Sequence, residues 1–125
     1  MLASRSRIPR RVGFTDTMRL GSRTGNRALV VYVKIAAPDD SSLELEATTQ
    51  AGIVVPKREV ARAVDRNRVK RRLRHLLAAR LSTVPSGTRI VVRALRGCTN
   101  MTSDELAEYL DRGLRASLQK EIARG

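Results

Sequence analysis

A basic stretch in the middle of the chain decides the fold: Asp65-Arg-Asn-Arg-Val-Lys-Arg-Arg-Leu-Arg-His-Leu-Leu-Ala-Ala-Arg-Leu81. At about 100° per residue its apolar side chains gather in one arc, which predicts an amphipathic helix with Asp65 as its N-cap. The predicted core-facing arc consists of Val69, Leu73, Leu76 and Leu77. The opposite face and its flanks carry Asn67, Arg68, Lys70, Arg71, Arg72, Arg74 and His75. One face can therefore close a core while the other presents positive charge.

The charge on this helix favours an anionic partner. Between Lys57 and Arg80 there are ten cations and two acids. Like charges at i, i+3 and i+4 repel by a few tenths of a kcal/mol per pair, so a helix selected only for stability would intersperse Glu. A solvated charged face and a membrane-surface helix are the alternatives. The second usually carries Trp or Phe on its apolar face, which is purely aliphatic here. RNA or DNA is the predicted partner.

The whole chain of 125 residues is also basic, with 25 Lys and Arg against 12 Asp and Glu and a net charge of +13. Arg accounts for 21 of these cations, and its planar fork of donors matches phosphate. The longest apolar runs, such as 28–33, are far too short to span a membrane. Cys98 is the single cysteine, which excludes an internal disulfide framework. We expect one soluble, cytoplasmic domain over residues 1–125, with a basic N-terminal arm over about 1–12.

Hydrophobic patterning predicts the other elements. Strands are expected at 28–37, 43–48, 52–55 and 88–95, with 43–48 pairing back on the first strand. A last helix is expected from about Ser103 to Ala123, introduced by the capping-box spacing of Thr102 and Glu105. The predicted fold class is therefore α+β, with a mixed sheet of about four strands packed by helices.

The stretch from Gly52 to His75 resembles the signature of the bacterial ribonuclease P protein subunit. The segment 66–74, Arg-Asn-Arg-Val-Lys-Arg-Arg-Leu-Arg, follows the RNR motif of that family without a gap. The element at 13–21 and the strand around Tyr32 are similar to the segments that precede the motif in the family. The resemblance implies a ribosomal-protein-S5-domain-2-like fold in which a left-handed βαβ crossover contains the RNR helix.

The resemblance also implies a function, namely the protein subunit of the ribonucleoprotein that removes the 5′ leader from precursor tRNA. In that family the catalytic RNA holds the Mg²⁺ ions, so we expect no catalytic residue and no metal ligand in the protein, which alone would be inactive. The residues expected to bind the catalytic RNA are Arg66, Asn67, Arg68, Lys70, Arg71, Arg72 and Arg74. Those expected to bind the leader are Phe14, Met18, Tyr32, Val54, Lys57, Arg58 and Arg62.

Some positions depart from the family pattern or have a plainer explanation. Met18 stands where the family has a second aromatic residue, and the loop at 56–64 replaces a Gly and an Asn and gains Glu59. Phe14 could belong to the core, and Arg72 could lie over the apolar flank of the helix. A non-catalytic RNA-binding protein such as a ribosomal protein is the alternative function. We expect no membrane contact and no obligate protein partner.

Overall fold

The computed structural model describes residues 8, 11–35 and 49–124, with the backbone alone for 11–15. The helices are α1 (Arg11–Leu20), α3 (Ala63–Arg80) and α4 (Ser103–Arg124). The strands are β1 (Ser22–Gly25), β2 (Leu29–Lys34), β3 (Gln50–Val54) and β4 (Arg89–Ala94). Two short 3₁₀ turns complete the set, η2 (Leu81–Thr83) and η3 (Arg96–Cys98).

The four strands form one mixed sheet in the order β1-β2-β4-β3. β2 pairs antiparallel with β1 and β4, whereas β3 runs parallel to β4. Two parallel neighbours need a crossover connection, and α3 supplies it. The predicted α+β fold with a four-stranded mixed sheet is confirmed, while the handedness of the crossover stays a prediction. The strand expected at 43–48 lies outside the described residues. Within the described sheet, β1 and β4 are the two neighbours of β2.

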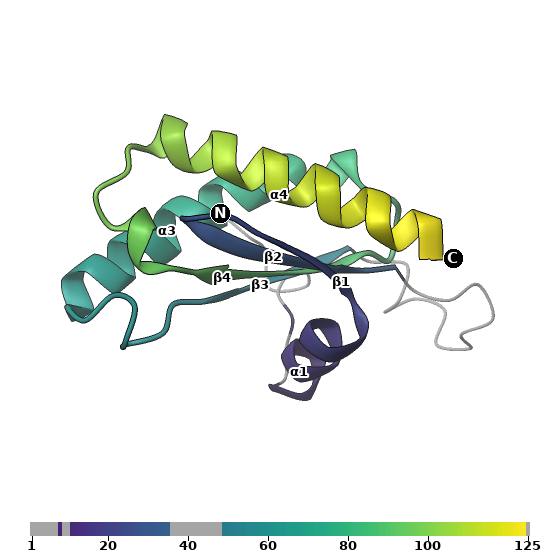
Figure 1. Cartoon of the computed structure of the whole chain (residues 1–125), viewed down its shortest axis with the longest axis horizontal. Coiled ribbons are helices and arrows are strands. Elements are labelled where there is room, and N and C mark those ends of the chain that lie inside the picture. Colours follow the sequence, from purple (N-terminus) through teal and green to yellow (C-terminus); the bar gives the residue numbers. More distant parts are fainter. Residues whose placement is uncertain (1–7, 9–10, 36–48, 125) are drawn as a thin grey trace.

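The helices cover the two faces of the sheet unequally. α3 and α4 lie together on one face, and α1 lies on the other (Figure 1). The main core fills the space beneath α3 and α4, where Val69, Leu73 and Leu77 are buried as predicted. Leu76 is only partly buried at the edge of this core. No helix in the described part of the chain combines the length and apolarity needed to cross a membrane.

Helix α3 begins three residues earlier than predicted. Arg62 is its N-cap, with extended backbone and no capping side chain, so Asp65 lies within the first turn rather than at the cap. The Arg66 guanidinium donates to the carbonyl oxygens of Val60 (3.0 Å) and Ala61 (2.7 Å), just before the helix. The buried side chain of Val60 and these two bonds hold the start of the helix without a capping side chain.

Helix α4 matches its prediction closely. The Thr102 hydroxyl accepts from the Glu105 amide at 3.2 Å, and the Glu105 carboxylate accepts from the Thr102 amide at 3.1 Å. This capping box lowers the pKa of Glu105, chiefly through the hydrogen bond from the Thr102 amide. Gly113 allows close approach to the sheet, since a Cβ there would lie 2.6 Å from Val31 Cγ2. The buried Ser117 hydroxyl donates to the Val31 carbonyl at 2.8 Å, which fixes α4 on β2.

The structure adds two elements that sequence patterns did not predict, α1 and β1. α1 begins at Arg11, so the last two residues of the predicted basic arm are helical. Ile8, also within that arm, donates its amide to the Ala51 carbonyl at 3.2 Å and is buried. β1 is a four-residue polar strand held by antiparallel pairing with β2. β1 shows no apolar alternation, and α1 has only 10 residues, fewer than the window of about 11–18 over which helical periodicity is judged.

Candidate nucleic-acid interface

The outer face of α3 carries cations that the protein itself leaves available. Arg71 is exposed, and the neighbouring Lys70 and Arg74 are half-buried. Within the described residues, none of these three side chains has a hydrogen bond or an ion pair. Asn67 is exposed near them on the same helix. The burial of Val69 and Leu73 turns this face outward, because side chains three and four residues apart share a helix face.

Other predicted cations on α3 are engaged by the protein. The Arg72 guanidinium donates to the Met101 carbonyl at 2.9 Å and so ties α3 to the segment before α4. Arg68 pairs with Asp65 one turn earlier, with 2.5 Å between Nη2 and Oδ1. Arg66 holds the start of the helix, as described above. These three guanidinium groups are therefore oriented before any partner binds, although Arg68 remains largely exposed.

The end of α3 is fixed to α4 by an ion pair. The Arg80 guanidinium donates to both carboxylate oxygens of Asp111, at 2.5 and 3.2 Å, and to the Leu76 carbonyl at 2.8 Å. The hydrogen bond from Arg80 holds the pKa of Asp111 below its usual value. Two parallel N–H bonds to one carboxylate also fix direction, which a single charge pair does not. Together with the Arg72 bond near the start of α4, this ion pair sets the relative placement of the two helices.

The opposite face of the sheet carries the residues predicted to bind a leader. Met18 on α1 and Val54 on β3 pack with Tyr32 on β2 in a small second core. Tyr32, however, is only 5% exposed, since it is packed with Ile8 and Val91. The Tyr32 side chain is therefore covered by its neighbours, and its binding to a leader stays a prediction. Phe14 lies in α1, and its side chain is outside the described residues.

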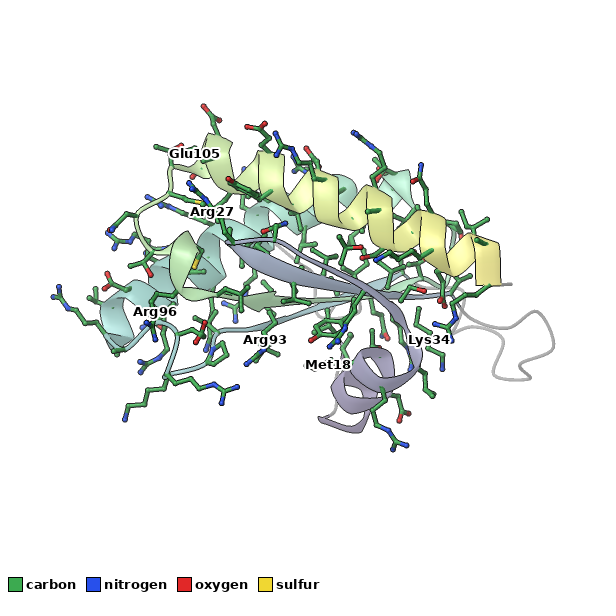
Figure 2. The ribbon with its side chains drawn as sticks, viewed as in Figure 1. Met18, Arg27, Lys34, Arg93, Arg96 and Glu105 are labelled. Carbon is green, nitrogen blue, oxygen red and sulfur yellow. The ribbon has the colours of Figure 1, made fainter. Side chains whose placement is uncertain are left out.

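Arg93 lies on this same face and was not among the predicted site residues. On β4 it stands between Val30 of β2 and Val54 of β3 in the strand register. Its side chain points to the side of the sheet on which α1 and Met18 lie (Figure 2). Side chains alternate between the two faces of a strand, and Ile90 and Val92 face the main core, so Arg93 lies on the other face. This period of two is the signal by which the sequence could have placed it.

The loop between β3 and α3 presents three further predicted cations, Lys57, Arg58 and Arg62, all exposed. The Glu59 carboxylate accepts from the Arg96 backbone amide at 3.2 Å, which fixes this loop against η3. Glu59, the apparent insertion, is thus used to hold the loop.

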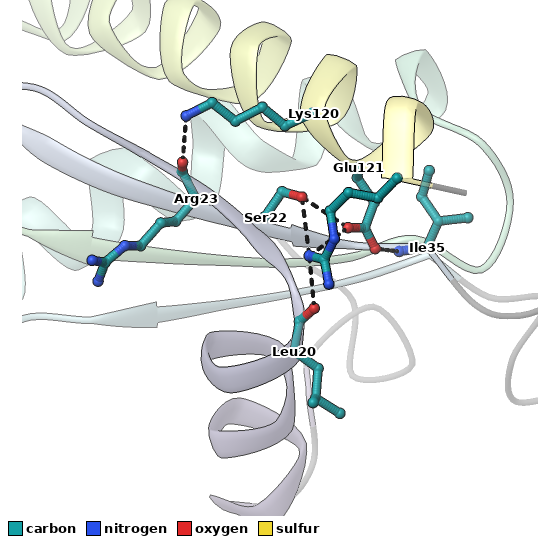
Figure 3. Close-up of polar contacts among 7 residues, drawn as sticks. Leu20, Ser22, Arg23, Ile35, Lys120 and Glu121 are labelled. Carbon is teal, nitrogen blue, oxygen red and sulfur yellow. Dashed lines mark hydrogen bonds and ion pairs between the residues drawn. The ribbon is translucent and has the colours of Figure 1, made fainter.

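The end of α4 fixes the position of α1 and β1 (Figure 3). The Glu121 carboxylate is 11% exposed and accepts from the Ser22 hydroxyl (2.9 Å) and the Ile35 amide (3.0 Å). Arg124 donates to the Leu20 carbonyl at 3.1 Å, at the last residue of α1. Lys120 donates to the Arg23 carbonyl at 2.9 Å. We call Lys120, Glu121 and Arg124 the α4 clamp.

The side chains at these surfaces are mostly positively charged. The described residues include no group of three or more His, Cys, Asp or Glu side chains that could hold a metal ion. Cys98 is buried, and desolvation raises the pKa of its thiol. His75 is exposed on α3 beside the cations. The two surfaces offer guanidinium and ammonium donors, which suit phosphate groups.

The α4 clamp predicts a specific effect on stability. Glu121→Ala should lower the free energy of unfolding by about 1–2 kcal/mol, because the Ser22 hydroxyl and Ile35 amide lose their acceptor. Glu108→Ala, which removes an exposed ion pair with Arg112, is the control and should cost less than about 0.5 kcal/mol. Urea denaturation and the amide exchange rate of Ile35 measure the two effects. Equal destabilisation in both variants would contradict the clamp.

Comparison with known proteins assigns the chain to a family. The family model for ribonuclease P matches residues 2–117. The ribonuclease P protein component of Streptomyces bikiniensis is 44% identical over 119 residues, covering 94% of this chain and 96% of that protein. The component from Acidothermus cellulolyticus is 42% identical over 125 residues, covering 100% and 98%. The solved structure of the Staphylococcus aureus RNase P protein has a TM-score of 0.73 at 26% identity, covering 90% of this chain and 96% of that one. The chain belongs to the ribonuclease P protein family.

Proposed function

We propose that this protein is the protein component of a bacterial ribonuclease P, which acts in the cytoplasm on the 5′ ends of precursor tRNAs. In this proposal α3 binds the catalytic RNA, and the sheet face beneath α1 binds the 5′ leader. The observation that carries it is the outer face of α3, where Lys70, Arg71 and Arg74 have no partner among the described residues. The family match over residues 2–117 supports the same assignment. The alternative of a ribosomal protein has no observation in its favour.

The two surfaces have different physical characters that suit different RNA contacts. On α3 the cations stand on a helix that is fixed by the core and by Arg80, so they can meet phosphates at defined positions. On the sheet face Arg93 stands between Val30 and Val54. This part of the face therefore places one positive charge beside apolar side chains. Such a surface suits a single strand, whose bases contact apolar groups while its phosphates contact cations.

We assign the bond cleavage itself to the RNA partner. Metal-assisted phosphodiester hydrolysis needs divalent ions that clamp the attacking and leaving oxygens. The proposal places these Mg²⁺ ions on the RNA subunit, as the family resemblance implies. The residues of this chain then act by binding and orienting the two RNAs, and by lowering the repulsion between their phosphate backbones.

Reconstitution tests the proposed function directly. The full chain, added to a bacterial ribonuclease P RNA at low Mg²⁺ and physiological salt, should increase cleavage of precursor tRNA, because the cations offset phosphate repulsion. The protein without RNA should release no leader. Gel analysis of 5′-labelled precursor measures both. The proposal is wrong if the protein neither stimulates cleavage nor binds either RNA.

Charge removal on α3 should weaken binding of the catalytic RNA. In the double variant Arg71→Ala/Arg74→Ala, the slope of log Kd against log salt should fall by about 1 for each phosphate that the variant no longer neutralises. The variant Arg112→Ala/Arg115→Ala removes the same charge from exposed positions on α4 and is the matched control. Filter binding across a series of salt concentrations gives both slopes. Identical slopes for the two double variants would mean that the α3 face is only solvated.

Arg93 should affect the leader and not the catalytic RNA. Arg93→Ala should weaken binding of precursor tRNA to the reconstituted enzyme by about tenfold, which corresponds to about 1.4 kcal/mol for one charge-assisted hydrogen bond. Binding of tRNA without a leader should not change. Comparing the two substrates in the same assay separates this effect from misfolding. An equal decrease for both substrates would remove Arg93 from the leader site.

A further inference from the structure

Residues of α3 and the first residue of α4 line a groove. Both helices lie on the side of the sheet away from α1 (Figure 1). Its volume is about 540 Å³, within the range of about 300–1,000 Å³ that small-molecule sites occupy. It is lined by Arg68, Arg71, Arg72, His75, Leu76 and Ser103. The volume is thus large enough for one nucleotide, and the lining is cationic.

The guanidinium groups in this groove differ in how they are held. Arg72 is fixed by the Met101 carbonyl at 2.9 Å, and Arg68 is held by Asp65 at 2.5 Å. Arg71 has no partner within the described residues. A planar guanidinium that is already oriented loses little conformational freedom when an aromatic ring stacks on it. The groove therefore offers two pre-oriented planes and one unpaired donor.

The apolar part of the lining indicates more than a phosphate site. Leu76 is partly buried and packs against the main core, with one side on the groove. A phosphate group gains nothing from an apolar surface, because its oxygens then lose water without a hydrogen bond in return. A nucleobase has apolar faces and gains from packing on Leu76 and on a guanidinium plane.

From these observations we propose that the groove takes one unpaired nucleotide of the ribonuclease P RNA. Its base enters between Leu76 and the guanidinium of Arg72, and its phosphate meets Arg71. The catalytic RNA is the source because the sheet separates this groove from the face that carries Arg93 and Met18. This inference rests on the proposed function, and it adds recognition of a base to the binding of phosphates by α3.

Filling the groove without changing charge tests the inference. Ser103 is exposed at the first position of α4 and lines the groove, so Ser103→Phe places a ring where the base would lie. We expect the affinity of the full chain for the RNA subunit to fall about five- to 150-fold, the range that the loss of one base-stacking contact produces. The salt slope should stay unchanged, because the protein neutralises the same number of phosphates. Ser82→Phe, at an exposed position on η2, is the control and should bind normally.

A second measurement uses the unsubstituted chain and does not depend on how Ser103→Phe folds. Adenosine 5′-monophosphate should shift the NMR signals of the Leu76 methyl groups and the Ser103 amide. Ribose 5-phosphate, which carries the same phosphate without a base, should shift them much less. Equal shifts from the two ligands would overturn the inference, as would unchanged RNA affinity in Ser103→Phe. Either result, with normal salt-dependent RNA binding retained, leaves the proposed function standing. Absence of RNA binding by the unsubstituted chain would instead refute the proposed function.

Discussion

The burial of one apolar stripe of α3 is the constraint on which the rest of the structure depends. Val69, Leu73 and Leu77 are buried against the sheet, and each contributes about 1.5–3 kcal/mol relative to an exposed side chain. Each pair of like charges on the outer face costs only a few tenths of a kcal/mol. Burial therefore outweighs repulsion, and a helix with few acids can persist without its RNA. The same burial fixes the rotation of α3 about its axis, so Lys70, Arg71 and Arg74 lie on the face turned away from the core.

That rotation divides the arginines of α3 into two groups with different tasks. Arg66 and Arg80, near the ends of the helix, donate to backbone carbonyls and to Asp111, and each uses a guanidinium to reach more than one acceptor. A lysine offers one compact charge and cannot bridge acceptors in this fixed geometry. Part of the arginine excess of this chain is therefore structural, although its composition alone points to nucleic acid. The cations in the middle of the outer face, which have no partner among the described residues, are the ones proposed to bind RNA.

The sequence predicts the elements whose periodicity is strong and misses those held by distant contacts. The arc of Val69, Leu73 and Leu77 and the capping box at Thr102 depend on neighbours along the chain, so both were predicted correctly. β1 is short and polar, and its pairing with β2 and its bonds to the α4 clamp come from residues far away in the sequence. The cover of Ile8 over Tyr32 is equally non-local. Arg93 is a different case, because its position depends only on neighbours along the chain. Side chains of a strand point to the two faces in turn, so the burial of Ile90 and Val92 is enough to place Arg93 on the other face.

The two surfaces proposed to bind RNA differ in how much buried apolar surface supports them, and this difference bears on the proposed tasks. The α3 face rests on the main core and on the Arg80–Asp111 pair, so its shape depends on the global fold. The leader face is closed by α1 and Ile8, which pack on a much smaller core and are tied to the rest by the α4 clamp. Segments with little buried apolar surface open at a lower free energy than the core does. In the proposed function, the rigid face meets a catalytic RNA of one sequence. The face that opens at lower free energy meets leaders of many sequences, because it can adjust to each of them.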